Sequence, residues 1–306
     1  MNSSTRRTVG LMAAALFTLS ACASGAGASP SPSAEAPSSA PSSAPSVATS
    51  PSAAAPSIAV PAAITTAGKL VWCVDVSYPP EESFKADGTT AEGSDIDIAT
   101  EIAKRFGVTV EIDNTSFTGI IASLVGKKCD LIISGMNDTA ERQKQVSFVD
   151  YLKVGQGLLV KAGNPKGIKT LEDLSGKTVA VRLGTTNLDA LTAENVKLKA
   201  ASKAEIAIQT FDQDTDAFQQ LALGRVDAYS GDSPVCAYYA AKPDNAGKFE
   251  VGGTPIDPVP IGIAIRKDDT ELKAAVQAAM DAMYADGTMK SIVDKWGMTN
   301  AVVLLK

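Results

Sequence analysis

The chain has 306 residues, a formal net charge of −6 at pH 7 and no histidine. Without histidine, Ser-His-Asp triads, histidine metal sites and imidazole acid–base catalysis are excluded. The 28 basic residues form no block and are outnumbered by 34 acidic residues, so we expect no nucleic acid partner. We assign no metal site and no cofactor.

The first 21 residues have the pattern of an export signal. Arg6 and Arg7 precede a mostly apolar run (9–19) that is too short to span a membrane comfortably. The run ends in LSAC (19–22), which resembles a bacterial lipoprotein signal cleaved before Cys22. The resemblance implies a lipid (palmitate) on Cys22 and a protein anchored at the outer face of the cell membrane. Ordinary signal cleavage, with Cys22 incidental, is the alternative.

Residues 22–62 are predicted to form a disordered tether. They are almost all Ser, Pro, Ala and Gly, and Glu35 is their only charge. Such a segment buries too little apolar area to offset the entropy of ordering it. About 240 residues remain for folded structure, enough for one large lobe or two small ones.

The folded region opens with alternating strand and helix patterns, at 69–76 (strand), 93–106 (helix), 108–112 (strand), 117–125 (helix) and 131–133 (strand). This order predicts a parallel sheet with right-handed crossovers. Ligands of such sheets sit beyond the carboxyl ends of the strands. Residues 75–78 and 135–137 lie at those ends and are expected to face one crevice.

The stretch DLIISGMNDTAER (130–142) carries the densest chemistry. An apolar strand runs into a turn of small residues, and a helix is expected to begin at Thr139. Arg142 then offers a planar, two-pronged donor to a carboxylate. The alternative is a solvated Arg142 that pairs with Glu141 or Asp138.

A second series follows. A strand at 152–160 leaves the first lobe. Near the end of the chain we expect a strand at 261–266 and then two helices, the first with Asp269 as its cap. Between them we expect, in order, 171–174 (helix), 178–181 (strand), a helix from Asn187, 206–211 (strand), 215–223 (helix) and 226–230 (strand). GKKCD (126–130) before Ser-Gly and GRVD (224–227) before Ser-Gly echo each other, although the match is too short to prove duplication.

Six motifs then match a family in order and spacing: YPP (78–80), GSDIDIA (93–99), FTGII (117–121), SGMNDTAER (134–142), GTT (184–186) and GD (231–232). From Lys69 to its end the chain resembles the family 3 extracellular solute-binding proteins, which bind polar amino acids for ABC importers. The resemblance implies an α/β, two-lobed periplasmic-binding-protein-like type II (Venus flytrap) fold. Each lobe would be a mostly parallel sheet flanked by helices, with two hinge strands that let the cleft close. Lobe 1 would be 63–153 plus 261–306, and lobe 2 would be 154–260.

The resemblance also implies roles for site residues. Arg142 would grip the ligand α-carboxylate, and Asp232 would accept the α-ammonium. Tyr78 and Phe117 would sandwich the aliphatic part of the ligand. The remaining ligand-binding positions are the turn residues Gly135, Asn137, Thr185 and Thr186, and two positions that read the ligand side chain, Asp75 and Arg182.

Some alternatives stay open at this stage. Asp232 could simply cap a helix at 234–241, and Tyr78 and Phe117 could be core residues. Glu81 stands where the family often has an apolar residue, and we expect it near the cleft mouth. Because Asp75 and Arg182 match the positions that read the ligand side chain, we expect that side chain to be polar. Arg182 argues against a cationic ligand, because like charges repel in a closed cleft.

Three cysteines follow Cys22. Cys73 and Cys129 are expected on adjacent parallel strands, where they either form a disulfide or remain two buried thiols. Cys236 has no expected partner.

The leading functional prediction is a monomeric, lipid-anchored receptor that delivers an amino acid to an ABC permease and its ATPase, and not an enzyme. The alternative is a cyclohexadienyl or arogenate dehydratase-like enzyme on the same scaffold. Without histidine, that enzyme would need Glu81 or Glu82 for acid–base chemistry.

Overall fold

The computed structural model describes residues 58–305. The predicted export signal, the predicted lipidation site Cys22 and most of the predicted tether lie outside the described residues. Ile58 and Val60 pack against the core, and helix α1 (Ala62–Ala67) follows them. Among the described residues, no helix is long and apolar enough to cross a membrane.

Lobe 1, as we use the term for the structure, is built on three parallel strands: β4 (Thr109–Asn114), β1 (Lys69–Val74) and β5 (Leu131–Ile132), in that order across the sheet. Side chains alternate along β1 between two apolar clusters, so that Trp72 belongs to one and Cys73 to the other. The helices of this lobe are α2 (Ser94–Phe106), α3 (Ile120–Val125), α7 (Thr270–Ala285) and α8 (Thr288–Lys295). A small hairpin, β2 (Ser83–Phe84) with β3 (Ala91–Glu92), completes it.

Lobe 2 repeats this plan. Its parallel strands are β9 (Ala228–Asp232), β7 (Thr178–Arg182) and β8 (Ala207–Phe211), and β10 (Phe249–Val251) is added at an edge. The helices are α4 (Thr186–Ala200), α5 (Asp214–Ala222) and α6 (Ser233–Ala241). Two further apolar clusters form its core. Of the lobe 1 residues that the structure describes, Tyr78 alone belongs to a lobe 2 cluster.

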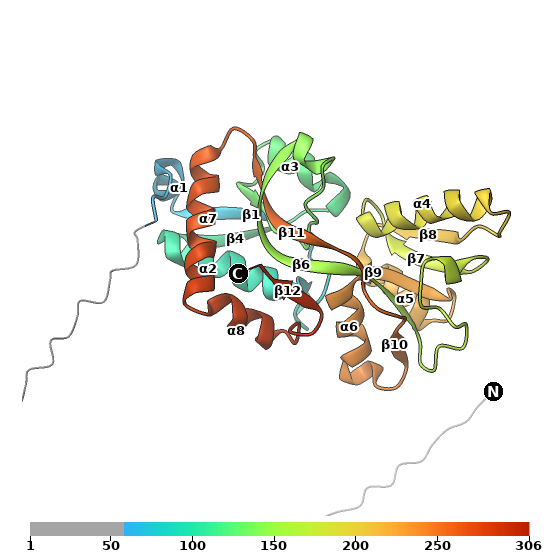
Figure 1. Cartoon of the computed structure of the whole chain (residues 1–306). Coiled ribbons are helices and arrows are strands. Elements are labelled where there is room, and N and C mark those ends of the chain that lie inside the picture. The colour runs from blue at the N-terminus through green and yellow to red at the C-terminus, as the bar shows by residue number, and fades with distance from the viewer. Residues whose placement is uncertain (1–57, 306) are drawn as a thin grey trace, which may run out of the picture. The chain divides into compact units, whose positions relative to one another are not determined.

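Two long strands, β6 (Val146–Lys161) and β11 (Ile256–Arg266), run antiparallel between the lobes (Figure 1). β6 pairs with β11 from Val146 and with β9 from Gln156, so a single ten-stranded sheet runs through both lobes. The predicted two-lobed fold with two connecting strands is therefore confirmed. A third strand at the crossing, β12 (Val302–Leu304), pairs with β6 and was not predicted.

The echo between the two lobes has a physical basis. The carboxylate of Asp130 accepts a hydrogen bond from the amide of Val71, and that of Asp227 accepts one from the amide of Thr178, each at 2.9 Å. Each aspartate thus ties the start of one strand to the neighbouring parallel strand in the sheet, β5 to β1 and β9 to β7. Both turns contain a residue with positive φ, Lys127 in lobe 1 and Gly224 in lobe 2.

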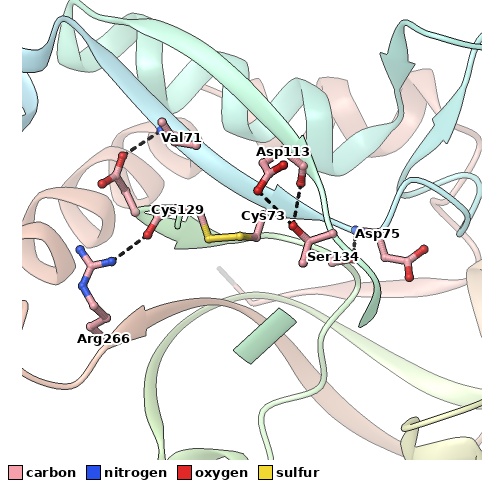
Figure 2. The surroundings of a disulfide bond; sticks show 9 residues. Val71, Cys73, Asp75, Asp113, Cys129, Ser134 and Arg266 are labelled. Carbon is pink, nitrogen blue, oxygen red and sulfur yellow. Dashed lines mark hydrogen bonds between the residues drawn. A yellow bond between two sulfur atoms is a disulfide. The ribbon is translucent and has the colours of Figure 1, made fainter. Parts of the chain in front are cut away.

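Cys73 and Cys129 form a disulfide, so the alternative of two buried thiols is wrong (Figure 2). The bond joins β1 to the segment that leads into β5, and Arg266 donates to the carbonyl of Cys129 (2.8 Å). Cys236 is free and buried. Figure 2 also shows Asp75 and Ser134 beyond the disulfide, at the ends of the two strands that it joins.

We predict that the double substitution Cys73→Ser and Cys129→Ser lowers the free energy of unfolding by about 4 kcal/mol. The estimate follows from the loop entropy of the 56-residue separation. Urea denaturation measures it. A reductant serves as control, because it should destabilise the native protein and leave the double variant unchanged.

Candidate functional site

The carboxyl ends of β1 and β5 are held together by side chains. The hydroxyl of Ser134 accepts from the amide of Asp75 (3.0 Å) and donates to Glu82 (2.9 Å). The amide of Gly135 donates to Asp95 (2.8 Å) in the first turn of α2. Gly135 has a φ of +52°, and a Cβ there would lie 3.0 Å from the Tyr78 ring. The turn predicted to face the crevice therefore requires glycine.

Glu81 lies inside the molecule, so its predicted place at the cleft mouth is wrong. Tyr78 and Glu82 exchange two backbone hydrogen bonds that fold the segment back on itself, and the amide of Asp95 donates to the carbonyl of Glu81 (3.0 Å). Glu81 is 1% exposed, and its carboxylate oxygens have no hydrogen-bond partner among residues 58–305. Burial, with Asp95 and Asp232 nearby, raises the pKa of Glu81 well above its ordinary value.

Arg142 sits on a short 3₁₀ turn (Arg142–Lys144) and not on the helix predicted from Thr139. The helix cannot extend because β6 begins at Val146. Arg142 Nη1 donates to the carbonyl of Asn137 (2.8 Å), and Nη2 donates to that of Gly184 in lobe 2 (3.2 Å).

The expected alternative for Arg142, a pair with Glu141 or Asp138, is not what the structure shows. Glu141 binds Lys144, and Asp138 accepts from Gln143. The guanidinium of Arg142 is instead held by backbone carbonyls from both lobes.

In lobe 2 the turn after β7 is held by its two threonines. Thr185 caps α4 by accepting from the amide of Leu188 (3.2 Å), and it donates to the carbonyl of Arg182 (2.8 Å). The hydroxyl of Thr186 donates across the interface to the side-chain oxygen of Asn137 (2.8 Å). The side-chain amide nitrogen (Nδ2) of Asn137 has no hydrogen-bond partner among the described residues.

Asp232 occupies the N-cap position of α6, but its carboxylate makes no capping bond, so the capping-only interpretation is wrong. Its carboxylate accepts from Asn187 (3.0 Å), and its backbone amide donates to the hydroxyl of Tyr78 (2.8 Å). Burial raises the pKa of Asp232, while the bonds from Asn187 and Tyr78 oppose this. Asn187 was missed in the sequence, where its only signal is its place directly after the GTT turn.

The rings of Tyr78 and Phe117 do enclose a side chain between them, but that side chain is the guanidinium of Arg182. The guanidinium carbon lies 4.2 Å from the Tyr78 ring centre and 4.1 Å from the Phe117 ring centre. Asp75 lies 3.9 Å from Arg182 Nη1, and its carboxylate accepts from the hydroxyl of Ser77 (2.5 Å) and the amide of Phe117 (2.8 Å). The sequence had predicted that the aliphatic part of the ligand would lie between these two rings.

Together, these contacts bring all ten predicted binding residues to the region where the lobes meet. Charged groups of opposite sign lie on both sides of it, with Asp75 and Arg142 in lobe 1 and Arg182 and Asp232 in lobe 2. A site of this kind can hold a small molecule that carries both charges.

Comparison with known proteins identifies the family. Residues 70–299 match the model of the bacterial extracellular solute-binding proteins, family 3. The chain belongs to this family. It is 33% identical to the L-cystine-binding protein TcyJ of Escherichia coli over 230 residues. These aligned residues make up 75% of this chain and 82% of that protein.

Solved structures of similar proteins have the same fold as this chain. An ancestral arginine-binding protein bound to arginine superposes with a TM-score of 0.68 and 39% identity, over 75% of this chain and 98% of the other. The ancestral amino acid-binding protein AncCDT-1, described as a precursor of cyclohexadienyl dehydratase, gives 0.66 and 38%, over 76% and 97%. Both likenesses support the two-lobed type II fold.

We predict that Asp214 makes the protein less stable as pH rises. Asp214 is buried at the start of α5 and accepts from the Tyr229 hydroxyl (2.6 Å), and burial raises its pKa to about 7. A carboxyl with a raised native pKa contributes stability while protonated and loses it on ionisation. The free energy of unfolding should therefore fall between pH ~4 and ~7, that is, between the unfolded and the native pKa.

Urea denaturation across this pH range measures the effect. Asp214→Asn should show a smaller fall than the native protein, whereas Asp216→Asn, exposed on the same helix, should match the native protein. Equal pH dependence in the native protein and Asp214→Asn would contradict the prediction.

Proposed function

We propose that this protein captures an amino acid between its two lobes and delivers it to the permease and ATPase of an ABC importer. The observation that carries the proposal is the placement of Arg142 and Asp232 on opposite sides of one interlobe region, Arg142 on a 3₁₀ turn of lobe 1 and Asp232 at the end of β9 in lobe 2. A zwitterion that leaves water needs a partner for each charge, and these two side chains provide them. Relatives named for cystine and arginine support the same class of ligand.

In the proposed complex, Arg142 turns its two nitrogens from the carbonyls of Asn137 and Gly184 to the ligand α-carboxylate. A charge-assisted, two-pronged pair is stronger than two bonds to neutral carbonyls. In this proposal the Thr186 hydroxyl and the side-chain amide nitrogen of Asn137 share the carboxylate. Asp232 accepts the α-ammonium. The Ser134-Gly135 turn and Glu81 lie on the same side of the site.

The proposed lobes are 63–153 plus 261–306 and 154–260, and the ligand closes the cleft by rotation about β6 and β11. Several bonds between the lobes support this assignment of a closing interface. They are Arg142 to Gly184, Thr186 to Asn137, Asp232 to Tyr78, and Asp214 to Ser77 (3.2 Å).

We predict that Arg142→Ala abolishes amino-acid binding and leaves the melting temperature nearly unchanged. Arg142 makes its hydrogen bonds at the interlobe surface and does not contribute to an apolar cluster. A thermal-shift screen of the common amino acids identifies the ligand, because a molecule that binds only the folded state raises its stability. Isothermal titration calorimetry then compares the native protein with the variant.

Arg225→Ala is the matched control, since Arg225 is an exposed arginine of lobe 2 and should bind like the native protein. Retained affinity in Arg142→Ala would overturn the site assignment. Arogenate and prephenate belong in the same screen, because Glu81 and Glu82 are both buried with raised pKa values and favour the dehydratase alternative. Formation of a phenyl product would show that the protein is a dehydratase-like enzyme and would overturn the binding proposal.

The anchoring of the protein is a separate proposal. We infer that Cys22 carries a lipid and that residues 22–62 tether a monomeric receptor to the outer face of the membrane. In cells that express the full chain, Cys22→Ala should move the protein from the membrane fraction to the medium or periplasm. Cys236→Ala should stay with the membrane fraction, and an unchanged distribution of Cys22→Ala would refute the anchor.

A further inference from the structure

Glu81 is a buried carboxyl group at a position where the family often has an apolar residue, so the family resemblance gives it no role in binding. It is 1% exposed, and neither of its carboxylate oxygens has a hydrogen-bond partner among residues 58–305. The other buried carboxyl groups of the described residues each accept at least one hydrogen bond; they are Asp75, Glu82, Asp95, Glu194, Asp214 and Asp232. Because a buried carboxylate without a donor is poorly stabilised, Glu81 favours the neutral acid.

The charged groups that face Glu81 from the surrounding elements are carboxylates as well. Burial raises the pKa of Glu81 most, and Asp95 on α2 raises it further. Lobe 2 contributes Asp232, directly before α6, and Asp214 on α5, which act in the same direction, while the backbone amide of Glu81 itself opposes them. Glu81 in turn raises the pKa of further neighbours, which are Tyr78 and Glu82 on its own segment, Tyr151 on β6 and Cys236 on α6. Within the described part of the chain, no basic side chain is one of these groups.

Glu81 lies at the end of the site where the ligand ammonium is proposed to bind. Its Cγ is 4.0 Å from the position that a Cβ on Gly135 would occupy, and the Tyr78 ring is 3.0 Å from the same position. The Tyr78 hydroxyl accepts from the backbone amide of Asp232 (2.8 Å), the proposed partner of the ammonium. Glu81 and Asp232 are therefore neighbours of one ring, although they come from different lobes.

A cation that enters this end of the site changes the balance for Glu81. An opposite charge within ~4–6 Å favours the ionised form of a carboxyl group and can lower its pKa by ~1–3. Burial also raises the pKa of Asp232, but the hydrogen bond from Asn187 (3.0 Å) opposes that rise, whereas Glu81 accepts no such bond. A proton displaced by the ammonium is therefore expected to come from Glu81.

We propose that Glu81 is a second anionic partner of the ligand ammonium: it is a neutral acid in the unliganded protein and ionises when an α-ammonium group is bound beside Asp232, so that capture of an amino acid releases a proton. This inference rests on the proposed amino-acid-binding function. The O–H bond of the Glu81 carboxyl group breaks, the carboxylate keeps the electron pair, and the proton passes to water or buffer.

The direction of the pH dependence follows from this linkage. A bound state that holds fewer protons than the free state is favoured as pH rises, so affinity for the amino acid should increase with pH by at most ~10-fold per pH unit for one proton. The increase is confined to the interval between the pKa of Glu81 in the complex and its higher pKa in the free protein. Because the chain has no histidine, no imidazole contributes to proton release in this interval.

Calorimetric titration of the native protein tests the proposal, with the common L-amino acids and L-cystine as probes. The tightest binder is then titrated from pH ~5 to ~8, a range that covers much of the pKa range of buried glutamates, in pairs of buffers that differ in ionisation enthalpy. The dependence of the measured enthalpy on the buffer gives the number of protons released per amino acid bound. We expect a release that peaks at ~0.5 to ~1 proton, as follows from a pKa difference of ~1–3 between free protein and complex.

Two variants assign the proton to Glu81. Glu81→Gln keeps the volume of the protonated acid and cannot ionise, so its affinity should no longer rise with pH and its binding enthalpy should no longer depend on the buffer. Glu81→Met, which is apolar and of similar length, should lose the proton release in the same way. Glu205→Gln, at an exposed position of lobe 2, is the matched control and should release protons as the native protein does.

Amino-acid binding without proton release at every pH in this range, or with proton uptake, overturns the role of Glu81 while the proposed function stands. Release that persists in a folded Glu81→Gln or Glu81→Met variant overturns it as well, because the proton then comes from another group, such as Asp214 or Glu82. Folded native protein that binds none of the probes overturns the proposed function itself.

Discussion

Charged groups that lose their water where the two lobes meet are the constraint on which the rest of the structure depends. Asp75, Arg182 and Asp232 are all nearly fully buried, although each lies at or directly after the end of a strand. A buried charge is tolerated only when it is paired or hydrogen-bonded. The surrounding residues can be understood as the means of supplying those partners, from Ser77 and the amide of Phe117 on Asp75 to Asn187 on Asp232.

Local signals were enough to predict much of this arrangement. The apolar spacing at 93–106 and the glycine after it specify a helix that the structure places at Ser94–Phe106, with Gly107 as its left-handed cap. Asp269 caps α7 as expected, by accepting from the amide of Leu272 (3.3 Å). The order of strands and helices is also sufficient to bring Asp75 and Gly135 to one region, because the parallel strands β1 and β5 end at the same edge of the sheet.

Features that depend on distant partners were not predictable in this way. β12 and the β2–β3 hairpin have two or three residues per strand, too few for any periodicity, and pairing alone defines them. The burial of Glu81 follows from a backbone bridge between Tyr78 and Glu82 and not from its residue type. Arg182 was recognised as a site residue, but its position between two rings of the other lobe depends on contacts more than sixty residues away in sequence.

The short strand β12 has a mechanical consequence for any motion between the lobes. Where β6 crosses from one lobe to the other, Leu152, Lys153 and Val154 pair with β11 along one edge and with β12 along the opposite edge. The hydroxyl of Ser233, at the start of α6 in lobe 2, also donates to the carbonyl of Ala301 just before β12 (2.7 Å). The crossing is thus a three-stranded ribbon with neither edge of its central strand free. A rotation of one lobe against the other must twist this ribbon as a unit, so the last residues of the chain set the torsional stiffness of the joint.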